Sequence, residues 1–196
     1  MAGTLTKLAG ADLATAVERA TLSPEAMAPL AGCPDVETAL DLLENGGFAA
    51  EAVRLLAHAL PKRERVWWAC MCAANTAPPD LGETERMARE TAETWVRQQK
   101  EEQRYNAFTH AQSTDFQSPE AWAAVSAFWS GESISLKDLP AVPPPPHASG
   151  AAAAGGVALA AVRGDIARYP ARLKRFLESG RNIAAGGPGR MPPEEP

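Results

Sequence analysis

The sequence predicts an all-α protein of eight to ten short helices arranged in antiparallel hairpins. Three observations support this prediction: apolar residues recur at helical spacing from end to end, no segment alternates like a strand for long, and start and stop signals separate the periodic segments. Two Ser-Pro-Glu helix starts, at residues 23–25 and 118–120, also allow a HEAT-like or TPR-like stack.

Five helices are predicted in the first half of the chain, with starts near Leu13, Pro24, Val36, Phe48 and Pro61. Ser23 supplies an N-cap, and Pro24 lacks only an N–H group that a helix start leaves unpaired. Asn45-Gly46-Gly47 ends the third helix. Pro61 ends the fourth helix and begins the fifth with almost no loop, so we expect these neighbours to pack closely.

The second half predicts further helices, with starts near Glu83, Glu101, Pro119, Ala151 and Tyr169. Pro78-Pro79 and Gly131 break the periodicity, and four consecutive prolines at residues 143–146 form a stiff, extended connector. Gly155-Gly156 weakens the helix that follows this connector by about 1 kcal/mol per glycine relative to alanine.

These signals divide the chain into five segments. We expect a flexible N-terminus (1–10), a helical core (11–138), a Pro-rich connector (139–150), a C-terminal helical pair packing on the core (151–185) and a disordered tail (186–196). The tail combines glycine, proline and acidic residues without apolar periodicity. Such a composition buries too little apolar surface to order itself.

Length and composition indicate one domain with tails, or two small subdomains, and a cytoplasmic location. Cys33, Cys70 and Cys72 make an odd count, which is typical of reduced, buried thiols. The amino terminus lacks the apolar segment of a secretory signal. The longest apolar run, at residues 151–162, is shorter than the roughly 20 residues of a membrane span, so we expect no membrane insertion.

The net charge of −5 is unevenly distributed. Residues 1–60 carry 3 basic and 8 acidic side chains, whereas residues 157–190 carry 7 basic and 2 acidic ones. This asymmetry suits a protein that orients on a partner, and it equally allows the two ends to attract one another.

The most informative stretch is the helix that follows Pro61, because it is apolar on every side and contains Trp67 and Trp68 in tandem. A helix of this kind must be enclosed by other helices, so we expect it to be the axis of the fold.

The start of this helix breaks a local rule, since Lys62, Arg63 and Arg65 occupy turns that favour acidic residues. The functional interpretation is a docking point for an acidic partner surface, with Trp68 or Leu60 as its anchor. The structural interpretation is pairing with carboxylates of the acidic N-terminal helices. The carboxylates expected to provide that pairing are Asp41 and Glu44.

The last helix predicts a second candidate surface. Arg172 and Arg175, with Lys174 between them, flank an apolar side formed by Leu173 and Phe176. This amphipathic pattern fits either closure of the core or contact with a partner. No aromatic residues are interleaved with the basic ones, so we expect a protein rather than a nucleic acid as the partner.

Metal and cofactor chemistry is not expected. Cys70 and Cys72 are two residues apart on a helix and point about 200° away from each other, so they cannot share one ion. His58 is predicted on the polar side of its helix with Glu51 and Arg54. The chain contains neither a P-loop nor a strand-following dinucleotide fingerprint.

Catalysis has one candidate residue. His110 has Glu101 and Asp115 nearby in sequence, and a carboxylate-oriented histidine is a possible general base. No serine or cysteine elbow accompanies it. We therefore assign no catalytic residue, with a small hydrolase using His110 as the alternative.

The string Leu60-Pro61-x-Arg63-x-x-Val66-Trp67-Trp68-Ala69-Cys70 resembles an uncharacterised family of bacterial proteins of about this length. The end of the helix at residues 127–131, the proline run and residues 172–176 extend this resemblance to roughly residues 10–185. The family is similar to cytoplasmic accessory proteins often encoded near type VI secretion genes, and no active site is assigned to it.

These observations predict a non-enzymatic, cytoplasmic interaction protein. The resemblance implies an adaptor, chaperone or accessory factor of a type VI-like secretion system, whose partner has an acidic surface. The alternatives are the His110 hydrolase and a basic-surfaced regulator associated with nucleic acid. A deep cleft with converging polar groups would favour the enzyme, and shallow helical grooves would favour the adaptor.

Overall fold

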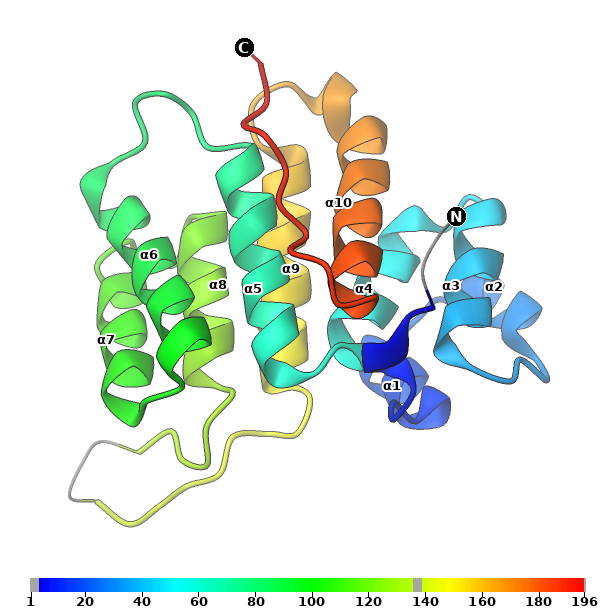
Figure 1. Cartoon of the computed structure of the whole chain (residues 1–196), viewed down its shortest axis with the longest axis horizontal. Helices are drawn as coiled ribbons and strands as arrows, with labels where there is room; N and C mark the ends of the chain where they lie inside the picture. The colour runs from blue at the N-terminus through cyan, green and yellow to red at the C-terminus, as the bar shows by residue number, and fades with distance from the viewer. Residues whose placement is uncertain (1–3, 136–138, 196) are drawn as a thin grey trace.

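The computed structural model describes residues 4–135 and 139–195, and all regular secondary structure in these ranges is helical (Figure 1). They contain ten α-helices, three 3₁₀ turns and no strand, so the all-α prediction is confirmed. The helices are α1 (Leu13–Ala20), α2 (Pro24–Met27), α3 (Val36–Asn45), α4 (Ala49–Ala59), α5 (Lys62–Asn75), α6 (Glu83–Gln98), α7 (Glu101–Gln112), α8 (Pro119–Phe128), α9 (Ala148–Val162) and α10 (Tyr169–Ala184). The 3₁₀ turns are Thr6–Leu8, Ala28–Leu30 and Ile166–Arg168. The expected end of the helical core at residue 138 lies outside the described residues.

Both Ser-Pro-Glu segments begin helices, as predicted. The Ser23 hydroxyl accepts a hydrogen bond from the Ala26 N–H at 3.3 Å, and the Ser118 hydroxyl accepts one from the Ala121 N–H at 3.1 Å. A proline occupies the first turn in each case. The first of these helices is only four residues long and continues into a 3₁₀ turn, so a repeated hairpin stack stays a prediction.

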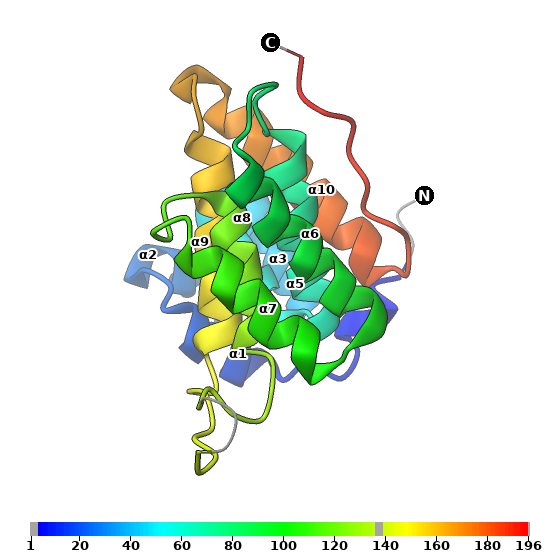
Figure 2. The same cartoon turned by 90° about the vertical axis from the view of Figure 1, so that its left-hand side faces the viewer.

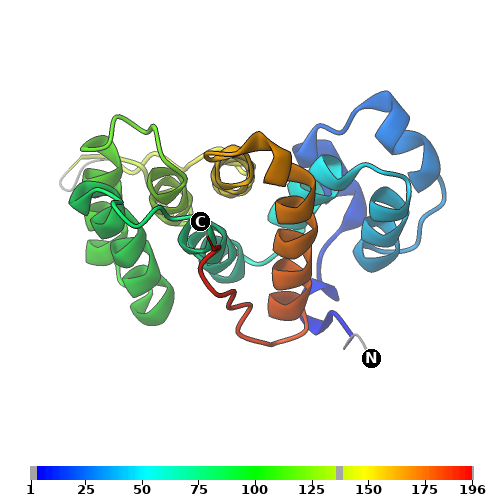
Figure 3. The same cartoon turned by 90° about the horizontal axis from the view of Figure 1, so that it is seen from above.

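Helix α5 lies in the middle of the molecule, as the sequence predicted, and packs against α6, α8, α9 and α10 (Figures 1 and 3). Trp68 is completely buried, and its indole N–H donates a hydrogen bond to the Phe176 carbonyl of α10 at 2.8 Å. A Cβ atom at Gly180 would lie 2.5 Å from the Leu56 side chain and 3.0 Å from this indole. Glycine is therefore needed for α10 to approach α4 and α5 closely.

Helix α9 is more central than expected. It was predicted to form a C-terminal helical pair that packs on the core, and it lies mainly against α8, α5 and α4. The helix begins at Ala148 and runs unbroken through Gly155-Gly156. A Cβ atom at Gly156 would lie 3.3 Å from the Pro119 carbonyl oxygen and from the Trp122 Cβ, so this glycine allows close contact with α8.

A buried ion pair joins the start of α8 to the end of α9. Glu120 is completely buried, and the Arg163 guanidinium donates hydrogen bonds to both of its carboxylate oxygens. Arg163 also donates to the Ala73 carbonyl of α5 at 3.4 Å. A buried carboxylate is tolerated only with such partners, so this pair fixes how the three helices meet.

The N-terminal segment was expected to be flexible, but residues 5–8 contact the core. Leu5, which precedes the 3₁₀ turn Thr6–Leu8, and Leu8, its last residue, are both buried. Their apolar side chains are part of the hydrophobic core, so the core includes residues that precede the first helix.

The tail also differs from its prediction. Residues 186–195 were expected to be disordered, but they run back along α10 and α5 in an extended path (Figures 1 and 2). The tail is held by hydrogen bonds from Trp67, Asn75 and Ser179 and by ion pairs to Glu194. Tertiary partners therefore order a segment whose composition alone cannot.

Among the described residues, no helix combines the length and apolar character that crossing a bilayer requires.

Candidate functional site

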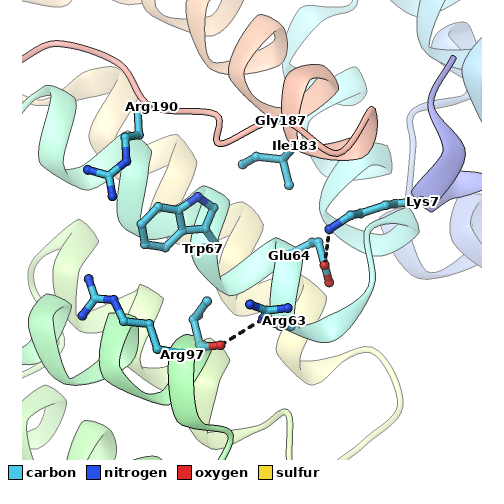
Figure 4. Close-up of a pocket in the computed structure, with 9 residues that line it drawn as sticks. Lys7, Arg63, Glu64, Trp67, Arg97, Ile183, Gly187 and Arg190 are labelled. Atoms are coloured by element: carbon cyan, nitrogen blue, oxygen red, sulfur yellow. Dashed lines mark hydrogen bonds and ion pairs between the residues drawn. The ribbon is translucent and has the colours of Figure 1, made fainter. Parts of the chain in front are cut away.

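A hollow of about 300 Å³ opens at the surface between α5, α6 and the tail (Figure 4). Its lining residues are Lys7, Arg63, Glu64, Trp67, Val96, Arg97, Ile183, Gly187 and Arg190. Four of these side chains are cationic and one is a carboxylate, so the hollow favours an anionic occupant. We call it the cationic hollow.

Arg63 reaches this hollow because it bonds a neighbouring helix. Its Nε donates a hydrogen bond to the Val96 carbonyl at 2.9 Å. Val96 lies in the last turn of α6, where carbonyls lack intrahelical donors and the helix dipole is negative. Arg63 is therefore unfavourable for the positive N-terminus of α5 but favourable for the negative C-terminus of α6. Its terminal nitrogens have no carboxylate partner within the described residues.

Trp67 separates the cations of the hollow. Its indole is half-buried and donates a hydrogen bond to the Pro188 carbonyl of the tail at 2.7 Å. The Arg190 guanidinium lies over the ring, 5.7 Å from its centroid, in cation–π contact. Arg190 makes no ion pair with a carboxylate in the described part of the chain.

The other two cations are partly neutralised. Lys7 lies 2.6 Å from the Glu64 carboxylate, and Arg97 lies 2.7 Å from the Glu93 carboxylate. Glu93 and Arg97 form an i,i+4 ion pair on α6. The Arg97 side chain is 58% exposed, so it is available at the rim.

Several residues predicted to bind a partner are buried instead. Trp68 and Leu60 have no exposed surface, so neither can anchor a partner, and that interpretation is wrong. Arg65 is also buried and donates hydrogen bonds to the His58 and Leu60 carbonyls at the end of α4. Burial lowers the pKa of Arg65 to about 10, so it remains charged at neutral pH.

The expected carboxylate partners of this cluster are also occupied elsewhere. Asp41 and Glu44 of α3 pair with Arg181 of α10, at 2.6 and 2.7 Å. The structural interpretation correctly predicted that groups within the protein stabilise these cations. It was wrong about which groups do so, because Arg63 and Arg65 bond backbone carbonyls and not the carboxylates of Asp41 and Glu44. Lys62 is exposed.

The second predicted surface divides into two parts. Arg172 is buried and donates hydrogen bonds to the Glu194 carboxylate at 2.5 Å and to the Ala161 carbonyl at 3.2 Å. Arg175 is half-buried and lies 3.5 Å from Glu194. Arg175 therefore remains accessible at the edge of the tail, whereas Arg172 contributes to the fold.

The sequence analysis missed Lys7 and Arg190 as lining residues of the hollow. Both lie in segments that were expected to be flexible or disordered. The signal available was the charge asymmetry, since Lys7 is the only cation before residue 19 and Arg190 is the only one after residue 181.

The thiols and histidines offer no assembled chemistry. Cys70 and Cys72 are completely buried, and burial raises the pKa of both thiols, so they remain protonated. His58 is buried against α9 instead of lying on the polar side of α4, which corrects our prediction. His110 is half-buried, and its ring makes no hydrogen bond within the described residues. In the same residues no group of His, Cys, Asp and Glu could hold a metal ion.

Comparison with known proteins identifies the chain at the family level. A family of unknown function (DUF6931) matches residues 39–184, a region that includes Arg63, Trp67 and Arg97 and ends before the tail. No characterised protein and no solved structure matches the chain. The expectation of an uncharacterised family is thereby confirmed. Because the matched region covers most of its length, the chain belongs to the DUF6931 family of unknown function.

Proposed function

We propose that this protein is a non-enzymatic interaction protein whose cationic hollow binds an acidic segment of a partner protein. Its expected setting is the bacterial cytoplasm, where it would act as an adaptor, chaperone or accessory factor of a type VI-like secretion system. The setting rests on the sequence resemblance, and the binding surface rests on the geometry of the hollow.

One observation carries the proposal: Arg63 and Arg190 flank the half-buried Trp67 without carboxylate partners among the described residues. Arginine and tryptophan are the residues most enriched among the energetically dominant contacts of protein interfaces. An acidic side chain between the two guanidiniums would gain charge-assisted hydrogen bonds, and the indole would supply apolar contact.

The arrangement of Arg63 supports recognition rather than nonspecific attraction. Its Nε is fixed by the Val96 carbonyl, so the guanidinium loses less side-chain freedom when it binds an anion. The rim cation Arg97 would mainly accelerate encounter with an acidic partner and make it dependent on ionic strength.

The binding step is tested by fluorescence anisotropy with a labelled glutamate-rich peptide. Arg63→Ala should weaken binding about tenfold, because it removes the fixed cation of the hollow. Arg86→Ala is the matched control, since Arg86 is an exposed arginine of α6 whose ion pairs are confined to Glu83 and Glu90. Equal affinities for the two variants, or equal binding of a lysine-rich peptide, would refute the role of the hollow.

The secretion link needs a separate test. Affinity capture from the native bacterium should use the wild-type chain, Arg63→Ala and Arg86→Ala, followed by mass spectrometry. The proposal expects secretion-system components that are lost only with Arg63→Ala. If the captured partners depend on Arg63 but belong to another system, the hollow remains the binding site and the link to secretion is rejected.

A further inference from the structure

The tail occupies a second surface, which adjoins the cationic hollow and shares Trp67 with it. We call this surface the tail groove and define it by the side chains of Trp67, Asn75, Arg172, Ser179 and Asn182. These residues come from α5 and α10, which lie side by side under the extended tail (Figures 1 and 2).

The groove contacts the first half of the tail through its backbone. The Trp67 indole N–H donates to the Pro188 carbonyl at 2.7 Å, and the Ser179 hydroxyl donates to the Gly189 carbonyl at 2.6 Å. The Gly189 N–H in turn donates to the Asn182 side-chain oxygen at 2.8 Å. Side chains that bond successive backbone groups of an extended segment are typical of peptide recognition.

Asn75 extends this pattern to the second half of the tail. Its side-chain N–H donates to the Pro192 carbonyl at 2.5 Å, and its backbone carbonyl accepts from the Glu194 N–H at 2.6 Å. Asn75 is almost completely buried, yet its Oδ1 atom has no donor within the described residues. The groove therefore holds an acceptor that the tail, with its consecutive prolines, leaves unused.

Two positions of the tail determine which sequence fits. Gly189 has φ +60°, and a Cβ atom there would overlap the Ile183 side chain and lie 3.1 Å from the Ser179 carbonyl oxygen. Glu194, five residues later, lies 2.5 Å from Arg172 and 3.5 Å from both Arg168 and Arg175. The groove thus requires glycine at one end and a carboxylate at the other.

The prolines between these positions reduce the conformational freedom that binding must remove. Pro192 and Pro193 are exposed and have fixed φ angles, so they hold the segment extended without filling a pocket. Met191 packs partly against the core between the two selective ends. A segment with this spacing reproduces the tail contacts whichever chain carries it.

We propose that the tail groove is a peptide-binding site for an extended, proline-containing segment in which a glutamate follows a glycine by five residues. The protein's own tail occupies the site in cis, and a partner protein carrying such a segment competes with it. Because a tethered tail has an effective concentration in the millimolar range, a partner displaces it only with additional contacts. The unused Oδ1 acceptor of Asn75 offers one such contact.

The test uses full-length chains and a labelled peptide with the sequence of residues 186–196. Gly189→Ala combined with Glu194→Gln should release the tail in cis and raise the affinity for this peptide at least about tenfold. Glu194→Gln alone should give a smaller increase. Glu195→Gln is the matched control, because Glu195 takes part only through its backbone carbonyl, which accepts from Arg168. We call the double variant the opened chain. Peptides with Ala at the position of Gly189, or with Gln at the position of Glu194, should bind the opened chain at least about tenfold more weakly.

Trypsin cleavage after Arg190 reports tail release independently, because a protease needs a locally undocked segment. The opened chain should lose residues 191–196 faster than the wild type and the Glu195→Gln chain. The proposal is overturned if the opened chain remains protected, if it binds no peptide, or if it binds all peptides equally. Dimerisation of the wild-type chain that Glu194→Gln abolishes would instead assign the groove to a second copy.

Discussion

The proline connector and the tail look alike in sequence and behave differently in the structure. Both are rich in proline, and neither residues 139–147 of the connector nor residues 186–195 of the tail contain helix or strand. In the connector, Leu139 and Val142 are 60% and 50% exposed, and within the described residues Val142 bonds only Ser133 and Ile134. The tail bonds α10, which directly precedes it, and also α5, where the Trp67 indole is 121 residues away from its Pro188 partner.

A proline-rich composition therefore predicts that a segment lacks helix, but it does not predict whether the segment contacts the rest of the protein. The tail carries Gly189 where α10 leaves no room for a Cβ atom, and Glu194 where α10 presents the buried Arg172. Without the tail, Arg172, which is buried in the structure, would lose its carboxylate partner. A buried cation of this kind is costly to leave unpaired, so it selects for an ordered tail.

The largest expected effect comes from Arg172. Arg172→Met removes hydrogen bonds to Glu194, Ala161 and Arg163, and should lower the free energy of unfolding by about 2–3 kcal/mol. Arg175→Met, on the same helix and also near Glu194, should change it by less than about 0.5 kcal/mol. Urea denaturation measures both. Equal losses would show that the tail attaches through general positive charge.

Gly189 separates tail docking from backbone strain. Gly164 also has a left-handed φ angle, +63°, but a Cβ atom there would meet open space. Gly164→Ala should therefore cost about 1 kcal/mol of strain alone, and Gly189→Ala about 2 kcal/mol because it also undocks the tail. Thermal denaturation with tryptic digestion measures both effects. If both variants keep the tail protected, Gly189 is not a docking determinant.

Acid should weaken both the contact between α4 and α9 and the docking of the tail, through different titratable groups. Burial, followed by the charges of Arg65 and Arg19, lowers the pKa of His58 from 6.5 to about 4, where α4 meets the start of α9. The unfolded chain then binds the extra proton between these values. Stability should accordingly fall as the pH drops from 6.5 towards 4, by on the order of 1–2 kcal/mol at pH 5. His58→Gln should flatten this slope, and His110→Gln should not.

Glu194 responds at lower pH. A hydrogen bond from Arg172, with the charges of Arg172, Arg168 and Arg175, lowers the pKa of Glu194 below its usual 4.5. The stability it contributes is present above pH 4.5 and is lost as the pH falls through the lowered value. Trypsin cannot be used there, so pepsin digestion below pH 4 should show tail release in the wild type. Release that already occurs near pH 6 would contradict the carboxylate anchor.

The connector should give the smallest effect. Pro144→Ser loosens a segment that bonds mainly to itself, so the free energy of unfolding should change by less than about 0.5 kcal/mol. A loss comparable to that of Gly189→Ala would mean that the connector is as firmly attached as the tail, and the comparison between them would fail.

Local sequence signals were sufficient to predict the helices. The starts at Ser23 and Ser118, the stop at Gly47 and the central position of α5 all follow from caps, prolines and apolar periodicity. The cationic start of α5 showed where to look, but the sequence could not show that Arg63 and Arg65 bond the carboxyl ends of other helices. Those partners are 5 to 33 residues away in the chain.

Long-range complementarity was the part that could not be predicted. The Trp67 indole bonds a carbonyl 121 residues away, and Asn75 bonds one 117 residues away. Neither contact leaves a periodic pattern in the sequence, because each joins a single side chain to an irregular backbone. The candidate site was therefore found through the predicted Arg63, while Lys7 and Arg190 became visible only in three dimensions.

Amide hydrogen exchange measured by NMR tests the central claim most directly. The N–H groups of Gly189 and Glu194 are hydrogen-bonded to Asn182 and Asn75, whereas Ala141 in the connector is an exposed residue whose N–H makes no hydrogen bond to the described part of the chain. A docked tail predicts that the two tail amides exchange at least about tenfold more slowly than that of Ala141, after correction for intrinsic rates. Exchange of all three at the rates of an unstructured peptide would contradict the docked tail and the groove proposed beneath it.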